Sequence, residues 1–314
     1  MAMKEAKQEK WHTASESLLF AFKDFILSRQ AMRASYGTMR FYNDTAGAFI
    51  GWLASAGVTS PGDVTARHVR AYLAEMAERT SIKTGKKLSD KTCHGHARAI
   101  KTMLRFWHEE GYLPNPVKFD MPKLERRRLP VLDAEQVAAV LKACANIREK
   151  ALLLFAVDTG LRLAEMASLS WCNLDMDNGV INLERGKSGK SRTVIAGAAV
   201  RRALLAYRRT QASGGNIAPI FQSANGGRLS PCGISQVLKR LSKRAGVPFS
   251  AHALRRSFCV LSLRAGMSIL HVQTLMGHAS LEMTRHYAES IADDILSEHR
   301  EHSPIDNLTR LKKR

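Results

Sequence analysis

SAHALRRSFCVLSLRAGMSILHVQTLMGHASLEMTRHY, residues 250–287, is the stretch of this 314-residue chain that says most about its fold and chemistry. Gly266 and Gly277 divide it into three short predicted helices. His252 and Arg255 are nearly one helical turn apart, so on a helix they share a face. Cations, imidazoles and a phenol suit chemistry on a phosphodiester, because each can neutralise a phosphate oxygen or move a proton. The pattern predicts that Tyr287 is a nucleophile toward DNA.

Taken singly, the polar residues of this stretch have ordinary structural explanations as helix caps, ion-pair partners or half-buried core side chains. The same holds for two cations further upstream. Arg162 follows a Thr-Gly-Leu turn at the start of a predicted helix, where its guanidinium could point at an anion. Lys187 lies in a glycine-rich turn, where a lysine is ordinarily just solvated. Only the combination of these residues, in this order, is specific.

The composition favours a polyanionic partner. The chain has 48 Lys and Arg against 28 Asp and Glu, a formal net charge of +20. Such a charge favours nucleic acid, because bound phosphates release their condensed counterions. An anionic membrane surface is the alternative, but the basic residues are spread along the chain and no single basic amphipathic helix dominates.

Cysteine usage and apolar runs predict a cytoplasmic protein without a membrane partner, and a DNA partner would make it nucleoid-associated. The five cysteines are scattered and form no Cys-x-x-Cys pair, which is typical of reduced thiols. The longest apolar run, residues 151–157, is far too short to span a bilayer. The N-terminus is charged and lacks the apolar core of a signal peptide.

Residues 1–13 are polar and charged and are predicted to form a flexible arm. Apolar residues at helical spacing then predict a helical DNA-binding domain, residues 14–117. Ser60-Pro61-Gly62 interrupts the helical pattern, Ser89 is a good N-cap for a fourth helix, and Gly111 ends that helix. Four helices of this length predict a compact bundle.

A cluster of basic residues lies before and inside the fourth predicted helix. It is a candidate surface for DNA, and a solvated basic face is the alternative for any single member. Two of its histidines lie two residues apart, so on a helix they diverge and no metal site is predicted. The cluster is Lys83, Lys86, Lys87, Lys91, His94, His96 and Arg98.

A basic linker, residues 118–129, is predicted between the domains, and its Arg126, Arg127 and Arg128 are further candidates for DNA contacts. The second domain, residues 130–290, begins with Asp133 as a helix cap. Two extended runs around the turn RGKSGK, residues 185–190, predict a β-hairpin. The remainder is helical. The predicted fold class is therefore mainly α, with a small antiparallel β-sheet in the C-terminal domain.

The motifs TGLRLAE, HALRRSF and LMGH, a lysine in a β-turn, and a tyrosine nine residues after the last histidine occur in fixed order. In this combination the chain resembles the tyrosine recombinase family, the phage integrases and Xer-type site-specific recombinases. The resemblance covers Pro130 to about Ser290. It implies a two-domain architecture, in which a helical core-binding domain precedes a mixed α/β catalytic domain.

The resemblance also implies a role for each matching residue. Two arginines would hold the non-bridging oxygens of the scissile phosphate, and a lysine would protonate the leaving 5′ oxygen. One histidine would take part in proton transfer, a second would hydrogen-bond the phosphate, a tyrosine would attack, and an acidic residue would support the site. In that order the residues are Arg162, Arg255, Lys187, His252, His278, Tyr287 and Glu165. The position after the second arginine is often histidine in relatives and is Arg256 here, which we do not expect to impair catalysis.

The expected reaction cleaves and rejoins double-stranded DNA through a 3′-phosphotyrosine intermediate and a Holliday junction. Guanidinium groups can stabilise the developing charge without a metal, the covalent intermediate makes ATP unnecessary, and no Walker-type motif or acidic metal cluster is present. No cofactor is therefore expected. The resemblance implies a homotetramer on DNA, with residues 291–314 as a tail exchanged between protomers, and a monomer is possible when the protein is free. A catalytically silent DNA-binding regulator and a topoisomerase or resolvase are the alternatives.

Overall fold

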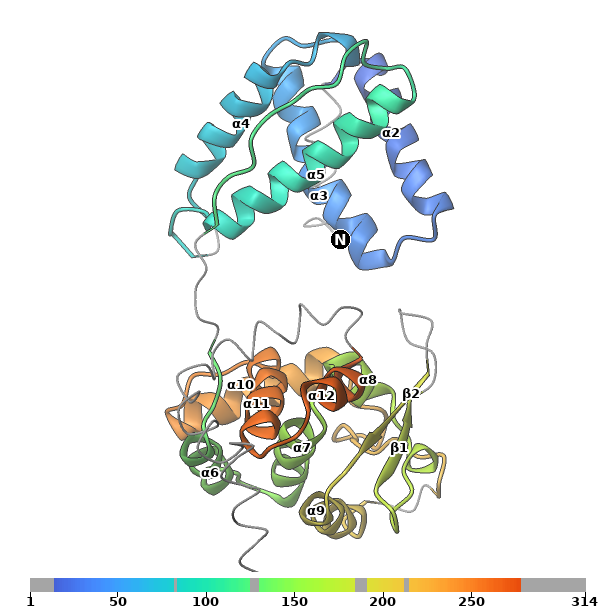
Figure 1. Ribbon diagram of the computed structural model, residues 1–314, viewed down its shortest axis with the longest axis vertical. Coiled ribbons are helices and arrows are strands. Elements are labelled where there is room, and N and C mark those ends of the chain that lie inside the picture. The colour runs from blue at the N-terminus through green and yellow to red at the C-terminus, as the bar shows by residue number, and fades with distance from the viewer. Residues whose placement is uncertain (1–13, 82–83, 125–129, 184–190, 212–214, 278–314) are drawn as a thin grey trace, which may run out of the picture. The chain divides into compact units, whose positions relative to one another are not determined.

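The computed structural model describes residues 14–81, 84–124, 130–183, 191–211 and 215–277. The chain divides into two compact units (Figure 1), Met1–Arg126 and Arg127–Arg314. Each unit has its own hydrophobic core. Among the described residues, no helix is both long and apolar enough to cross a membrane.

The described part of the first unit is a bundle of helices joined by short connections. Serine side chains begin three of the helices by accepting a hydrogen bond from the backbone N–H three residues on, as Ser89 does from Thr92. The predicted cap at Ser89 is confirmed, and Gly111, at φ 80°, follows the end of that helix as expected. The elements are α2 (Glu16–Ala31), α3 (Tyr36–Ser55), the 3-10 turn η2 (Pro61–Asp63), α4 (Ala66–Glu78) and α5 (Asp90–Glu109).

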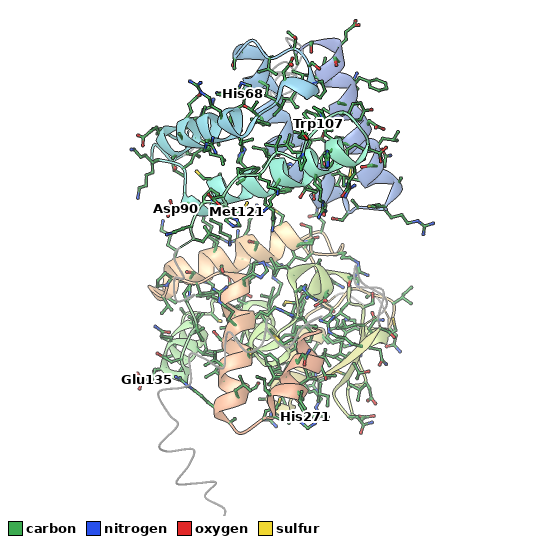
Figure 2. The ribbon with its side chains drawn as sticks, turned by 45° about the horizontal axis from the view of Figure 1, so that its top comes forward. His68, Asp90, Trp107, Met121, Glu135 and His271 are labelled. Atoms are coloured by element: carbon green, nitrogen blue, oxygen red, sulfur yellow. The ribbon has the colours of Figure 1, made fainter. Side chains whose placement is uncertain are left out.

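Large aromatic side chains fill the core of this unit. Phe22, Phe49 and Trp107 are fully buried, and the Trp107 indole lies among the helices (Figure 2). Its Nε1–H donates to the carbonyl of Ala21 at 2.9 Å, which satisfies the only polar atom that this side chain buries. Helix α5 contacts α2, α3 and α4. Its opposite face is therefore the one left for solvent or a partner.

The second unit is mainly helical with one β-hairpin, so the predicted fold class is confirmed. Strands β1 (Val180–Leu183) and β2 (Arg192–Ile195) pair antiparallel, with Val180 opposite Ile195 and Leu183 opposite Arg192. The other elements are α6 (Ala134–Lys142), α7 (Ile147–Thr159), α8 (Leu163–Ser168), the 3-10 turn η3 (Trp171–Asn173), α9 (Ala198–Arg208), α10 (Pro231–Ala245), α11 (Ala251–Arg264) and α12 (Ile269–Met276).

Local signals account for the way these elements begin and end. Asp133 caps α6 as predicted and forms a capping box with Gln136, in which each side chain accepts from the other residue's backbone N–H. Helices α11 and α12 are the first two of the three short helices predicted after Ser250, and the third lies outside the described residues. Each of these local predictions rests on residues close to one another in sequence.

Helix α7 is the central helix of the second unit and packs against α9 and α11. It ends at Gly160, which adopts the left-handed conformation with φ 58°. A Cβ at this position would clash with the ring of Phe258 on α11. Glycine is thus needed both for the turn and for the close approach of α11, and the chain leaves that turn directly toward Arg162.

Candidate active site

Arg255 joins the ends of two helices of the second unit. It lies on α11 and only 6% of its surface is exposed. Its Nη1 donates to the carbonyl of Gly160, where α7 ends. Its Nη2 donates at 2.5 Å to the carbonyl of Met276, the last residue of α12. A helix C-terminus exposes carbonyls that carry partial negative charge, so a guanidinium is well suited to this position.

Arg162 lies two residues after the Gly160 turn and forms the N-cap of α8. Its backbone N–H donates to Glu165 Oε2 at 2.8 Å, and its Nη1 donates to Glu165 Oε1 at 3.0 Å. The side chain remains 41% exposed, whereas that of Glu165 is 17% exposed. The carboxylate therefore orients a guanidinium that still reaches solvent.

A third arginine, Arg192 on β2, contacts the same carboxylate. Its Nη2 lies 2.8 Å from Glu165 Oε2, and its Nε donates to the carbonyl of Leu275 in α12 at 3.1 Å. Sequence reasoning did not single out this residue. A signal was available, because Arg192 has the strand parity of the buried Val194 and so points to the covered face of the hairpin.

Glu165 is ionised in this arrangement. Burial alone would raise the pKa of the carboxyl, but hydrogen bonds from Arg192 and from Arg162 outweigh it and hold the pKa below its ordinary value. A half-buried carboxylate between two guanidinium groups is a fixed negative charge that holds both cations in place.

The remaining predicted site residues are placed only in part. His252 is exposed on α11, one helical turn before Arg255. Arg256 donates from Nε to the carbonyl of Pro130 at 3.0 Å. Lys187, His278 and Tyr287 lie outside the described residues. The described chain ends just after α12, whose C-cap Gly277 has φ 60°.

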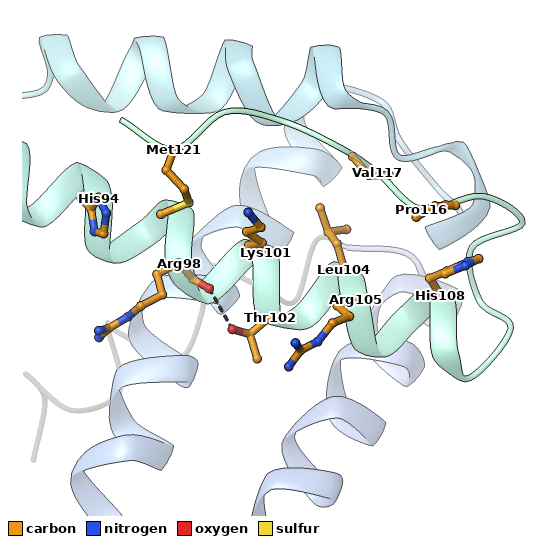
Figure 3. Close-up of a pocket in the computed structure, with 10 residues that line it drawn as sticks. All are labelled: His94, Arg98, Lys101, Thr102, Leu104, Arg105, His108, Pro116, Val117 and Met121. Carbon is orange, nitrogen blue, oxygen red and sulfur yellow. Dashed lines mark hydrogen bonds between the residues drawn. The ribbon is translucent and has the colours of Figure 1, made fainter. Parts of the chain in front are cut away.

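A row of exposed or half-exposed cationic and imidazole side chains runs along α5 in the first unit. The spacing is three, four, three, four and three residues, which keeps all six on one helix face. We call this set the α5 basic row: Lys91, His94, Arg98, Lys101, Arg105 and His108. Five of the six, from His94 onward, line a groove of about 500 Å³, closed on its other side by Pro116, Val117 and Met121 (Figure 3).

The basic residues predicted to contact DNA differ in their surroundings. Lys86 is exposed. Lys87 is exposed and pairs with Glu78 at 2.6 Å. The Arg98 guanidinium lies 5.1 Å from the centre of the Phe41 ring, which orients it along the surface. Lys83, Arg126, Arg127 and Arg128 lie outside the described residues.

His96 does not fit the predicted DNA surface. It is 9% exposed, and its Nδ1 is 2.9 Å from the hydroxyl of the buried Tyr72. Burial, and to a lesser degree the charge of Arg79, lowers the pKa of His96. The prediction grouped basic residues by their closeness in sequence and did not consider which face of the helix each one occupies. His96 lies on the face of α5 that packs against the core. Helical phase also identifies Lys101, Arg105 and His108, which the prediction missed.

Among the described residues, no group of three or more His, Cys, Asp or Glu side chains could hold a metal ion. What the described residues present instead is a half-exposed arginine held by an ionised carboxylate, with two further guanidinium groups bound to the ends of neighbouring helices. Fixed guanidinium groups suit the binding of a phosphate and the α5 basic row suits the binding of a polyanion, so this fold and site are those expected of a protein that acts on DNA.

Comparison with known proteins identifies the family. Residues 130–293 match the model of the phage integrase family. The tyrosine recombinase XerC of Rhodospirillum centenum is 31% identical over 279 residues, covering 84% of this chain and 80% of XerC. The tyrosine recombinase XerA of Saccharolobus solfataricus is 24% identical over 271 residues, covering 85% of this chain and 87% of XerA.

Solved structures agree at the level of the fold. The Tn1549 transposon integrase in complex with a circular intermediate DNA has a TM-score of 0.69 at 19% identity, covering 87% of this chain and 95% of that one. A lambda integrase dimer bound to a core site has a TM-score of 0.68 at 20% identity, covering 85% and 94%. The chain belongs to the phage integrase family: it is a tyrosine recombinase, an enzyme of site-specific DNA recombination.

Proposed function

We propose that this recombinase cleaves one DNA strand at a time by attack of Tyr287 on a phosphodiester. The Tyr287 oxygen forms a bond to phosphorus, the bond from phosphorus to the 5′ oxygen breaks, and a 3′-phosphotyrosine remains. The leaving 5′ oxygen takes its proton from Lys187. In the second half of the reaction, a 5′ hydroxyl of the partner strand attacks the phosphotyrosine. A new phosphodiester bond forms, the bond from phosphorus to the Tyr287 oxygen breaks, the attacking hydroxyl loses its proton and the tyrosine regains one. This exchange of strands passes through a Holliday junction and needs neither metal nor ATP.

One observation carries this proposal. Arg255, 93 residues after Arg162 in the sequence, binds the carbonyl of Gly160, which lies two residues before Arg162. The same guanidinium binds the carbonyl of Met276, two residues before His278. Segments from α7, α11 and α12 thus meet around one cation, and each leads to or carries a residue of the proposed catalytic set.

The electrostatics of the described residues suit an attack on phosphorus. Negative charge develops on the non-bridging oxygens in the transition state, and prepositioned guanidinium donors stabilise it without reorganisation. Arg162 is oriented by Glu165 and remains partly exposed, as a group that binds a DNA phosphate must. A phenol has a pKa near 10, so Tyr287 needs a cationic surrounding or a base such as His252 to react. His278 would complete the set by hydrogen-bonding the phosphate.

DNA would lie along the α5 basic row of the first unit. A row of six cations and imidazoles at one helix face matches a backbone of regularly spaced phosphates. Arg126, Arg127 and Arg128 would extend this contact along the linker. The assembly would be a homotetramer on DNA in which residues 291–314 pass between protomers, and it would act where chromosomal DNA lies, in the nucleoid.

A covalent-capture experiment tests the proposal. Nicked duplexes with a randomised core are incubated with the full-length protein, and adducts are isolated on a denaturing gel and sequenced. The wild type should yield adducts enriched in one sequence, and Tyr287→Phe should yield none while still binding that sequence. Absence of an adduct from the wild type, or an adduct with Tyr287→Phe, would contradict the proposal and favour a silent DNA-binding regulator. Adducts without exchange of strands between two duplexes would favour a topoisomerase or resolvase.

A further inference from the structure

Arg192 bridges three elements that the sequence keeps apart. It belongs to β2, its Nη2 contacts Glu165 of α8 at 2.8 Å, and its Nε donates to Leu275 of α12 at 3.1 Å. The side chain is 14% exposed. Two nitrogens of its guanidinium group are therefore held by two different elements, which distinguishes Arg192 from a solvated surface cation.

Gly277 supplies an independent observation. Its φ of 60° already favours glycine, and a Cβ at this position would come within 2.9 Å of Arg192 Cδ and Nε. The Arg192 side chain therefore lies directly against the residue at which α12 ends. Two guanidinium groups, Arg192 and Arg255, bind the consecutive carbonyls of Leu275 and Met276 just before that point. The end of α12 is held by two arginines from two different elements.

The contacts of Arg192 reach three parts of the proposed catalytic set. Through Glu165 the residue acts on Arg162, because the same carboxylate binds both guanidinium groups. Through Leu275 it acts on the segment that leads to His278. Through its own strand it acts on the hairpin, whose strands flank residues 184–190 and thus Lys187. Arg192 thus contacts both Glu165 and α12.

We propose that Arg192 is a positioning residue for strand cleavage: it couples the hairpin to Glu165 and Arg162 and to the end of α12. This inference rests on the proposed function, because it concerns the alignment of groups around the phosphate. Arg192 itself does not touch the substrate. Its effect is to fix the distance between the hairpin that carries Lys187 and the arginine that holds the phosphate.

The first test compares Arg192→Met with a matched control. Methionine keeps most of the apolar stem and removes the guanidinium. The control is Arg201→Met on α9, because Arg201 is also a partly buried arginine near the hairpin that donates to backbone carbonyls, those of Met176 and Asp177. It contacts neither Glu165 nor α12 through any bond in the described residues.

We expect Arg192→Met to slow adduct formation on the captured duplex by roughly 10- to 100-fold. This is the loss of rate expected when a catalytic group is displaced by a fraction of an ångström. The Kd for the duplex should stay at the wild-type value. Arg201→Met should lower the melting temperature and leave the cleavage rate of the folded protein unchanged. The cleavage rate of Arg192→Lys should lie between those of the wild type and Arg192→Met. An ammonium group can pair with Glu165 but lacks the planar guanidinium that reaches Leu275 as well.

The pH profile separates positioning from general support of the fold. Glu165 must stay ionised to hold Arg162, and hydrogen bonds from Arg192 help to keep its pKa low. In Arg192→Met the acid limb of the cleavage rate should therefore move to higher pH. In a Glu165→Gln background the substitution should neither move the limb nor slow cleavage much further, because both changes remove the same link.

The outcomes are distinguishable from those of the proposed function. A wild type without an adduct would overturn the catalytic proposal, and carboxyl NMR of Glu165, which needs no DNA, would still test the contact by the rise of the pKa in Arg192→Met. A normal adduct rate and an unmoved acid limb in Arg192→Met would overturn the positioning role. So would a loss of rate in Arg192→Met that is no larger than the loss Arg201→Met shows at the same decrease in melting temperature.

Discussion

The two units use their cations in opposite ways. In the first unit the α5 basic row stands on the surface, and its members repeat along one helix face. In the second unit Arg192 and Arg255 are largely buried and bind carbonyls and a carboxylate of their own chain. Surface cations can adapt to a long polyanion, whereas buried ones can align a few atoms with precision. The comparison predicts that substitutions in the first unit change affinity and those in the second change rate.

Arg255 should give the largest effect. Arg255→Gln removes the guanidinium group that binds the carbonyls of Gly160 and Met276. We expect the cleavage rate to fall by about 10³-fold. Two buried carbonyls lose their donors, which should also lower the free energy of unfolding by about 2 kcal/mol or more. Adduct kinetics and denaturant unfolding measure the two effects. A variant that cleaves normally would show that Arg255 is only structural.

Substitution of Lys187 should lower the rate of DNA cleavage and leave the stability of the protein unchanged. Lys187→Ala removes the proposed general acid, and we expect cleavage to slow by about 10²-fold with binding nearly intact. A 5′-phosphorothiolate duplex has a leaving group that needs no proton, so it should restore the rate. Failure of that rescue would remove the role of general acid from Lys187.

The α5 basic row should show the reverse pattern. Lys101→Gln should weaken binding of the duplex and reduce the slope of log Kd against log salt by about one, the contribution of a single phosphate contact. The cleavage rate at saturating DNA should not change. Arg70→Gln, which removes an exposed cation of α4 that is not a member of the row, is the matched control. An equal loss of affinity in both variants would show that only net charge matters.

His96 should have the smallest effect, and it should be on stability alone. Burial lowers the pKa of His96 from 6.5, so the unfolded chain binds its proton more readily than the folded one. Stability is therefore fully present above pH 6.5 and is lost as the pH falls below it. His96→Gln should flatten this acid-side loss, measured by denaturant unfolding between pH 5 and 8, at an unchanged Kd for DNA. A loss of affinity for DNA comparable to that of Lys101→Gln would show that His96 takes part in DNA binding.

The sequence predicted most where neighbours along the chain decide the outcome. The cap at Ser89, the capping box at Asp133, the turn at Gly160 and the pairing around residues 184–190 all depend on residues a few positions apart. It failed where the phase of a long helix decides which side is covered. His96 and Lys101 differ by five positions on α5, and only the packing against α3 and α4 shows that one is core and the other surface.

By itself, the sequence determined the class of this protein: an ordered set of motifs, a basic composition and a helical pattern with one hairpin. Only the tertiary structure decided that Arg255 binds the ends of α7 and α12, and that Arg192 joins β2 to Glu165. The physical reason is that hydrogen-bonding partners of a buried guanidinium come from whichever carbonyls the packing of distant helices leaves exposed to it. These bonds join residues that lie 27 and 95 positions apart in the chain, and no local sequence pattern predicts such contacts.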